Sequence, residues 1–134
     1  MPVPLRVVSV ERSLFEGDVD FIVANGADGE LGVLPRHAAL MTILKPGALK
    51  IVQGTDEQFL FVGGGFLEVL PDRVTVLADV AEHAEDISIE QAEAARKRAQ
   101  ERLAGTLSTS EEVEFNQALA IAEARLRLAR ARRG

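Results

Sequence analysis

The chain has 134 residues, a formal net charge of −6, and six aromatic residues that are all Phe. The negative charge argues against nucleic acid as a partner, and the lack of Tyr and Trp leaves no stacking platform for bases. There is no cysteine, which excludes disulfides, thiolate metal sites and a cysteine nucleophile. No apolar stretch approaches the length of a membrane span, and the first residues lack the apolar run of a signal peptide, so we expect no direct membrane insertion.

The composition changes near residue 85. Residues 1–85 carry six Lys/Arg against thirteen Asp/Glu, whereas residues 86–134 carry nine against eight. All five prolines, and all eleven glycines except Gly105 and Gly134, lie in the first part. This change predicts two domains: a turn-rich domain over 1–85 and a charged, alanine-rich helical domain over 86–134.

The first domain contains short apolar or β-branched runs that alternate with turn signals. These runs lie at 5–10, 18–23, 31–34, 40–44, 48–52, 58–62, 65–70 and 73–78. Turn signals about every eight to twelve residues favour an antiparallel β-sandwich or flattened barrel of seven to ten strands. Between two runs, the pair Pro46-Gly47 predicts a type II turn with a positive φ at Gly47.

From residue 86 the apolar period lengthens to that of a helix. Ser88 followed by Gln91 is a capping-box pattern that begins a first helix, and Gly105 marks its end. A second start at Ser108 opens a helix to about residue 132. The apolar stripes are Ala92, Ala95, Ala99 and Leu103 in the first helix, and Leu119, Ala122, Leu126 and Ala129 in the second. Because these stripes are thin, we expect an α-helical hairpin that burial holds weakly and that can detach.

No group of residues has the spacing of a catalytic or metal site. Gly63-Gly64-Gly65 is followed by a strand pattern rather than by Lys-Ser/Thr and a helix, which favours a tight bend over a phosphate loop. Asp28-Gly29-Glu30 lacks the other oxygens of a calcium loop, and His37 and His83 have no paired ligand spacing. We therefore expect neither catalysis nor a metal in this chain.

Two segments stand out as contact surfaces. In residues 29–38, Glu30 and the pair Arg36-His37 lie at the two ends of an apolar run, which a turn requirement for glycine does not explain. The last ten residues contain five arginines: Arg125, Arg127, Arg130, Arg132 and Arg133. They fit either a solvated helix end that complements the helix dipole or docking against an acidic protein surface, since guanidinium groups pair with carboxylates bidentately.

Taken in order, these motifs resemble those of the epsilon-subunit family of F-type ATP synthases. Residues 29–38, Gly-Glu-Leu-Gly-Val-Leu-Pro-Arg-His-Ala, look like the signature loop of the family. The segments 45–47, 64–69 and 74–79, and the paired helices after 84–87, follow in the expected order. The resemblance implies a sandwich of about ten antiparallel strands followed by an α-helical hairpin. It also implies a non-catalytic accessory subunit of an ATP-synthesising, proton-translocating rotary complex.

The resemblance further implies a place and partners. The protein would be a peripheral part of the central stalk on the cytoplasmic face of the bacterial membrane, with its sandwich bound to the gamma subunit and to the ring of c subunits. The residues at the ring would be Gly29, Glu30, Leu31, Gly32, Arg36 and His37. The hairpin would either fold down or extend toward the alpha and beta subunits and inhibit ATP hydrolysis. The arginines that would then face an acidic segment of beta are Arg125, Arg127, Arg130 and Arg132.

Some bacterial members of this family bind ATP in the folded hairpin through Ile or Leu, then Asp, two residues, Arg and Ala. Here Ser88 replaces the Asp, Gln91 replaces the Arg, and Glu123 falls near a position that those members fill with Arg. The matching positions that remain are Ile87, Ala92, Arg98 and Arg127. Losing a charge-assisted phosphate contact costs about 1.5–3 kcal/mol, so we expect weak or absent ATP binding and no cofactor.

Two other classes of protein stay open. The first is a small-ligand sensor whose hairpin closes on a nucleotide, against which Ser88 and Gln91 count. The second is a free-standing adaptor outside any rotary motor. An enzyme is the class that the sequence supports least.

Overall fold

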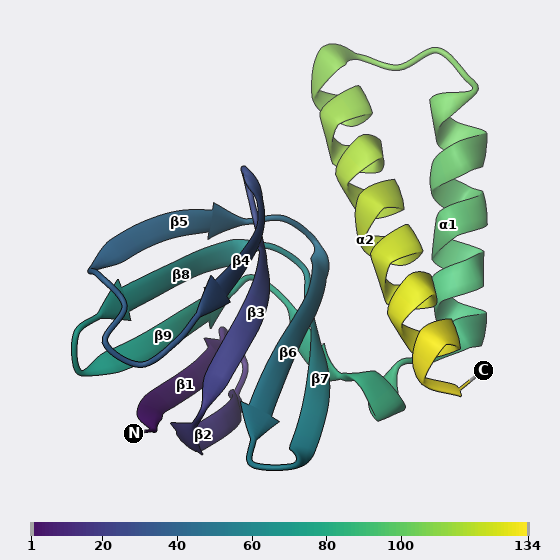
Figure 1. Cartoon of the computed structure of the whole chain (residues 1–134). Helices are drawn as coiled ribbons and strands as arrows, with labels where there is room; N and C mark the ends of the chain where they lie inside the picture. Colours follow the sequence, from purple (N-terminus) through teal and green to yellow (C-terminus); the bar gives the residue numbers. More distant parts are fainter. Residues whose placement is uncertain (1, 134) are drawn as a thin grey trace. The chain divides into compact units, whose positions relative to one another are not determined.

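The computed structural model describes residues 2–133, and the chain divides into two compact units, Met1–His83 and Ala84–Gly134. The first unit is built from strands and the second from helices (Figure 1). The strands are β1 Val3–Ser9, β2 Ser13–Val19, β3 Phe21–Gly26, β4 Gly29–Val33, β5 Leu40–Leu44, β6 Gly47–Gln53, β7 Asp56–Val62, β8 Gly65–Leu70, β9 Arg73–Ala78 and β10 Ala81–His83. The helices are the short 3-10 helix η1 Ala84–Asp86 and the α-helices α1 Ile89–Leu103 and α2 Thr109–Arg133.

The strands form one sheet that folds back on itself. Their order is β10-β7-β6-β3-β5-β8-β9-β1-β2, and β4 lies beside β3. Strand β3 makes the corner, because Ile22 pairs with β6 whereas Gly26 pairs with Leu44 of β5. The two layers that result form the sandwich of about ten strands that the sequence predicts (Figure 1). All paired strands are antiparallel except β1 and β9, which are parallel.

The core of the sandwich comes from the alternation of side chains along each strand. In β1, Val3, Leu5 and Val7 are buried, whereas Pro4 and Arg6 between them are exposed. Other strands contribute aliphatic residues to the same core, among them Val33, Leu49, Leu60, Leu67 and Val76. Since burying one such side chain contributes about 1.5–3 kcal/mol, this mainly aliphatic core, with the partly buried Phe15 packed against it, stabilises the sandwich.

Two glycine-containing turns differ in what they require. The triple glycine is the tight bend that the sequence predicts: Gly64 and Gly65 have φ of 107° and 124°. A Cβ at Gly65 would lie 2.1 Å from the carbonyl oxygen of Leu77, so only glycine lets β8 approach β9 here. The expectation of a positive φ at Gly47 is wrong. A Cβ there would lie 2.6 Å from Nδ2 of Asn25, so the close approach of Asn25 explains this glycine.

The helices begin and end where the sequence predicts. The Ser88 hydroxyl accepts a hydrogen bond from the Gln91 amide at 3.2 Å and caps α1. At the start of α2, the Ser108 hydroxyl accepts from the Glu111 amide at 3.2 Å. The Glu111 carboxylate accepts in return from the Ser108 amide at 3.1 Å, which completes a capping box.

The packed face of α1 lies one position away from the expected stripe. Helices α1 and α2 pack against each other, and Ala92 and Ala99 are buried, but Ala95 is exposed. Arg96 is half-buried instead, because positions 92, 96, 99 and 103 share one face of a helix. In α2, Ala122, Leu126 and Ala129 are buried, as the sequence predicts.

Candidate interaction surfaces

Glu30 lies in the second residue of β4, opposite Asn25 of β3. Gly29, just before it, has a φ of 125°, a conformation that favours glycine. Glu30 and Gly32 are exposed, whereas Val33 is fully buried, so β4 is anchored at one end and presents Glu30 to solvent at the other. This part of the expected ring surface is held by strand pairing rather than by a loose loop.

The turn after β4 contains the other part of the expected ring surface. The His37 amide donates a hydrogen bond to the Leu34 carbonyl at 3.2 Å, with Pro35 and Arg36 between them. Arg36 has a φ of 65°. This is the pattern of a type II turn with Arg36 at the position that usually holds glycine, and a left-handed non-glycine residue costs about 1–2 kcal/mol. Nδ1 of His37 donates to the Ala38 carbonyl at 2.8 Å, which fixes the tautomer of the ring.

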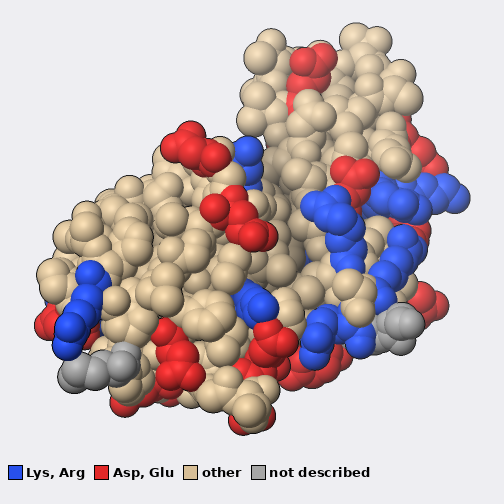
Figure 2. Space-filling view, viewed as in Figure 1, with Lys and Arg blue, Asp and Glu red and all other residues tan. Residues whose placement is uncertain are grey.

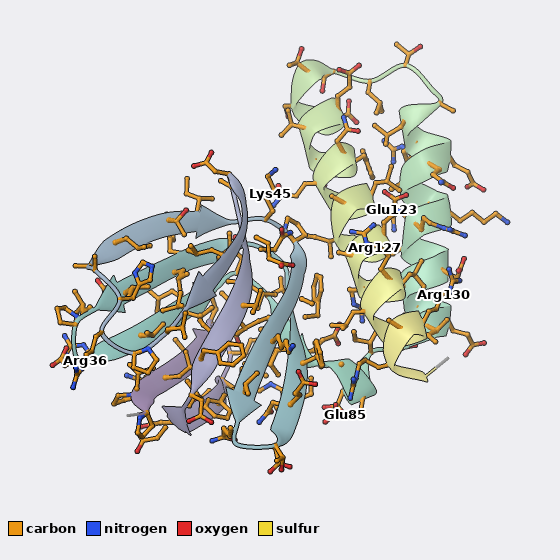
Figure 3. All side chains as sticks on the ribbon, viewed as in Figure 1. Arg36, Lys45, Glu85, Glu123, Arg127 and Arg130 are labelled. Atoms are coloured by element: carbon orange, nitrogen blue, oxygen red, sulfur yellow. The ribbon has the colours of Figure 1, made fainter. Side chains whose placement is uncertain are left out.

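The structure does not gather the six expected ring residues into one patch. A strand advances about 3.3 Å per residue, so about 10 Å separates Glu30 from Val33, and Arg36 lies in the turn that follows Val33. Arg36 lies at one end of the sandwich (Figure 3). There it lines a small depression of about 180 Å³ with Pro35, Pro71 and Asp72 among its other lining residues. Residues 29–32 and the Arg36-His37 pair are therefore two separate surfaces.

An apolar row crosses four strands of the sandwich and is exposed on three of them. Ile43 of β5 pairs with Phe66 of β8, which pairs with Leu77 of β9, which pairs with Val8 of β1. Ile43 is 58%, Phe66 47% and Leu77 50% exposed, and Met41 extends the row at 64%. This surface was not predicted from the sequence, although apolar residues at the outward positions of alternating strands were a signal for it.

The four arginines expected to dock on α2 form two groups. Arg127 and Arg130 line one depression of about 360 Å³ together with Arg96, Glu123 and Leu126 (Figure 3). Arg125 and Arg132 lie seven positions apart, which puts them on one face of the helix and on the face opposite Arg127. Figure 2 shows the Lys and Arg side chains gathered over the part of the hairpin where α1 begins and α2 ends.

One carboxylate, that of Glu93, neutralises part of this arginine group. Glu93 of α1 forms ion pairs with Arg96 at 2.6 Å and with Arg130 of α2, through different carboxylate oxygens. The side chains of Glu93, Arg96 and Arg130 are 34%, 36% and 53% exposed. Nε of Arg96 is buried without a hydrogen-bond partner within the described residues. Neither Glu93 nor Arg96 was predicted as a contact residue from the sequence, where their i, i+3 spacing was the available signal.

The four residual nucleotide positions lie in different surroundings. Ile87 and Ala92 are 1% and 0% exposed, and Arg98 lies outside the depression that Arg127 lines. Residues 2–133 contain no cluster of three or more His, Asp or Glu side chains suited to a metal ion. Within the same residues, neither helix combines the length and the apolar character needed to cross a membrane.

The fold and these surfaces define a class of protein: a β-sandwich joined to a helical hairpin with basic residues near its C-terminal end, whose prominent features are contact surfaces. A family model described as the β-sandwich domain of the ATP synthase delta/epsilon chain matches residues 2–84. The model for the long α-helix domain of the same chain matches residues 85–131. The chain therefore belongs to the ATP synthase delta/epsilon chain family and is an accessory subunit rather than the catalytic one. The resemblance inferred from the sequence is confirmed.

Relatives support this assignment over nearly the whole chain. The ATP synthase epsilon chain of Dehalococcoides mccartyi is 48% identical over 96% of this chain and 93% of its own. The epsilon chain of Herpetosiphon aurantiacus is 41% identical over 99% of this chain and 98% of its own. The epsilon chain of Acidithiobacillus ferridurans is 53% identical over 78% of this chain and 74% of its own.

Two solved structures share the fold at low sequence identity. A chain of the Euglena gracilis mitochondrial ATP synthase superposes with a TM-score of 0.80 at 23% identity, covering 92% of this chain and 78% of its own. A chain from the central stalk and c-ring structure of the Tetrahymena thermophila mitochondrial ATP synthase superposes with a TM-score of 0.73 at 12% identity. The match covers 96% of this chain and 97% of that chain.

Proposed function

We propose that this chain is the epsilon subunit in the central stalk of a proton-translocating F-type ATP synthase, peripheral to the cytoplasmic face of a bacterial membrane. In this role the sandwich couples the c-ring to the gamma subunit, and the hairpin restrains ATP hydrolysis. The observation that carries the proposal is an exposed apolar row on the sandwich combined with an arginine-rich end of the hairpin. Two likenesses support this placement: the relatives are ATP synthase epsilon chains, and the similar Tetrahymena chain belongs to a central stalk and c-ring assembly.

We assign the apolar row to the gamma subunit. Contiguous exposed apolar side chains mark protein interfaces, and Ile43, Phe66 and Leu77 are held in register by three paired strands. A rigid sheet face of this kind suits a contact that must transmit torque. Covering this face with gamma removes the apolar row from water, so the interface should be stable throughout rotation.

The c-ring contact then falls to the Glu30 end of β4. Glu30 is exposed, and pairing with β3 holds its backbone. Arg36 and His37 lie at the other end of the strand, so one polar loop of a c subunit cannot cover both ends. We therefore keep Gly29, Glu30, Leu31 and Gly32 as the principal ring residues.

The hairpin arginines need two partner surfaces. Arg127 and Arg130 face one side of α2, and Arg125 and Arg132 face the other. One acidic segment of the beta subunit can engage only one of these pairs. The four arginines can contact partners at the same time if α2 extends between beta and alpha, so we propose transient contacts with both subunits.

The experiment that tests the proposal removes residues 86–134 from the chain and assembles the remainder into the ATP synthase. Assembly and proton-driven ATP synthesis should stay near those of the intact complex, whereas latent ATP hydrolysis should rise. A control variant, Asp56→Asn in the intact chain, changes an exposed carboxylate of β7. Hydrolysis that stays at the intact level under all conditions would contradict the inhibitory role.

A second candidate function is a sensor whose hairpin closes on a nucleotide. One observation favours it: Arg96, Arg127 and Arg130 line one depression. Against it, Glu123 lines the same depression, and the Ser88 hydroxyl already caps α1. We expect titration calorimetry of the intact chain with ATP to show no binding in the micromolar range. Micromolar binding would establish the sensor function.

A further inference from the structure

Glu93 connects the two helices near the open end of the hairpin. One oxygen of its carboxylate pairs with Arg96 one turn further along α1, and the other pairs with Arg130 on α2, 37 positions away in the chain. The i, i+3 contact with Arg96 holds the carboxylate in place. Both oxygens of Glu93 are thus used by arginines, and Arg130 is the partner on the opposite helix.

Arg130 is also one of the arginines that the proposed function directs at an acidic partner surface. Three arginines, Arg96, Arg127 and Arg130, line the depression, and Glu93 and Glu123 supply two carboxylates to the same region. The closed hairpin is therefore largely neutralised by its own residues. A guanidinium that binds a carboxylate of its own chain is not free to bind one on a partner.

We propose that Glu93 is an internal competitor for Arg130: its carboxylate takes, in the closed hairpin, the place that a carboxylate-rich partner segment takes when α2 extends. Closure of the hairpin and docking of α2 then exclude each other at a single side chain. That Glu93 holds the hairpin closed follows from the ion pairs alone. That it competes with a partner for Arg130 rests on the proposed function. The partner chemistry is that of aspartate and glutamate side chains, because these present the same group that Glu93 presents.

The ion pair between Glu93 and Arg130 is weak enough for the hairpin to open and close reversibly. Ion pairs whose side chains are a third to a half exposed shift an equilibrium by roughly two- to five-fold. A buried pair would hold the hairpin shut, and a fully exposed one would add nothing. Because salt screens exposed charges, the closed population should fall as ionic strength rises.

The first test measures closure in the isolated, intact chain. The chain has no cysteine, so cysteines introduced at the exposed positions Lys97 and Ala131 take spin labels at those two sites alone. Distances between the labels report the open and closed populations. Glu93→Gln should raise the ratio of open to closed hairpin roughly two- to five-fold. Glu90→Gln, an exposed carboxylate on the same helix, should leave it unchanged. An unchanged ratio in Glu93→Gln would show that the ion pair between Glu93 and Arg130 does not hold the hairpin closed.

The second test exchanges the charges. Glu93→Arg and Arg130→Glu should each open the hairpin, and the double variant should return the open-to-closed ratio to within about two-fold of the original. If the double variant stays as open as the single variants, the ion pair between positions 93 and 130 does not stabilise the closed hairpin. In the assembled ATP synthase, the double variant should inhibit hydrolysis less than the original chain, since position 130 is no longer cationic. Full inhibition by the double variant would overturn the competition for Arg130.

Failure of the proposed function gives a different pattern. If deletion of residues 86–134 left hydrolysis unchanged, the inhibitory role would fail, yet the populations in the isolated chain would be unaffected. If deletion raised hydrolysis but Glu93→Gln did not strengthen inhibition in the assembled complex, only the competition at Arg130 would fail.

Discussion

The guanidinium carbon of Arg102, in the last turn of α1, lies 4.7 Å from the centroid of the Phe115 ring in α2. The same guanidinium pairs with the Glu111 carboxylate at 3.3 Å, and Glu111 closes the capping box with Ser108. The end of the hairpin next to the turn is thus held by a cation–π contact, an ion pair and a cap. The other end has the ion pairs of Glu93, so we expect opening to begin there.

The cation–π contact can be measured by a double-mutant cycle. Arg102→Gln and Phe115→Leu should show a coupling free energy of about 0.5–1 kcal/mol in urea unfolding followed by helix content, because the contact is partly exposed. The control cycle pairs Arg98→Gln with Phe115→Leu, and Arg98 is an exposed arginine one turn earlier on α1. Equal coupling in both cycles would show that Arg102 acts only through general charge.

The capping box makes the hairpin sensitive to acid. The backbone amide of Ser108 and then its hydroxyl hold the pKa of Glu111 below its ordinary value, and the charge of Arg102 adds to this. Since the folded pKa is the lower one, ionised Glu111 stabilises the hairpin above the unfolded value of about 4.3. This contribution is lost as the pH falls through the folded pKa.

The measurement compares the original chain with Glu111→Gln. At neutral pH the original chain should have the more stable hairpin by circular dichroism, and the difference should vanish well below pH of about 4. Glu114→Gln, an exposed glutamate one turn further along α2, serves as the control. A difference between the original chain and Glu111→Gln that is constant from neutral to acid pH would argue against the ionised cap.

Turn chemistry shows where the sequence was informative and where it was not. The pair Pro46-Gly47 carries the composition of a type II turn, yet Gly47 has no positive φ and instead makes room for Asn25. The turn with a positive φ after proline is at Pro35-Arg36. Local composition could not distinguish the two, because a contact from β3, about twenty residues earlier, decides the conformation at Gly47.

The positive φ of Arg36 costs conformational free energy, and two substitutions can distinguish this cost from the contribution of the side chain. Arg36→Gly and Arg36→Ala both remove the side chain, but only glycine adopts a φ of 65° without strain. Arg36→Gly should therefore be more stable than Arg36→Ala by about 1 kcal/mol in urea unfolding. Stabilities within about 0.2 kcal/mol of each other would mean that the turn relaxes around the substitution.

The sandwich and the hairpin could be predicted because period and turn signals agree over long segments, and the caps at Ser88 and Ser108 fix the helix starts. The parallel pairing of β1 with β9 could not, since it joins residues about seventy positions apart. The apolar stripe predicted for α1 was one position off because Ala94 and Ala95 precede Arg96, and the charged Lys97 and Arg98 follow it. That error hid Arg96, and with it the contact of Glu93 to α2.

The proposed contact of Glu30 with the c-ring can be tested by comparing charge reversal at Glu30 with charge reversal at Asp56. Glu30→Lys should weaken the coupling of proton flow to ATP synthesis in the assembled complex more than Asp56→Lys. Glu30 is held beside the β3–β4 turn, whereas Asp56 lies at the turn between β6 and β7. Glu57 is a poor control, because it pairs with Lys50 at 2.6 Å. Equal effects at positions 30 and 56 would show that Glu30 is only a turn residue.

The central claim is that the hairpin moves and that its position sets the rate of ATP hydrolysis. The most direct measurement is the distance between one label on α2 and one on the sandwich in the assembled ATP synthase, with hydrolysis recorded on the same sample. We expect two distance populations, and the hydrolysis rate should fall in proportion as the population with α2 extended away from the sandwich grows. A single distance that stays unchanged while the rate of hydrolysis varies would contradict the account.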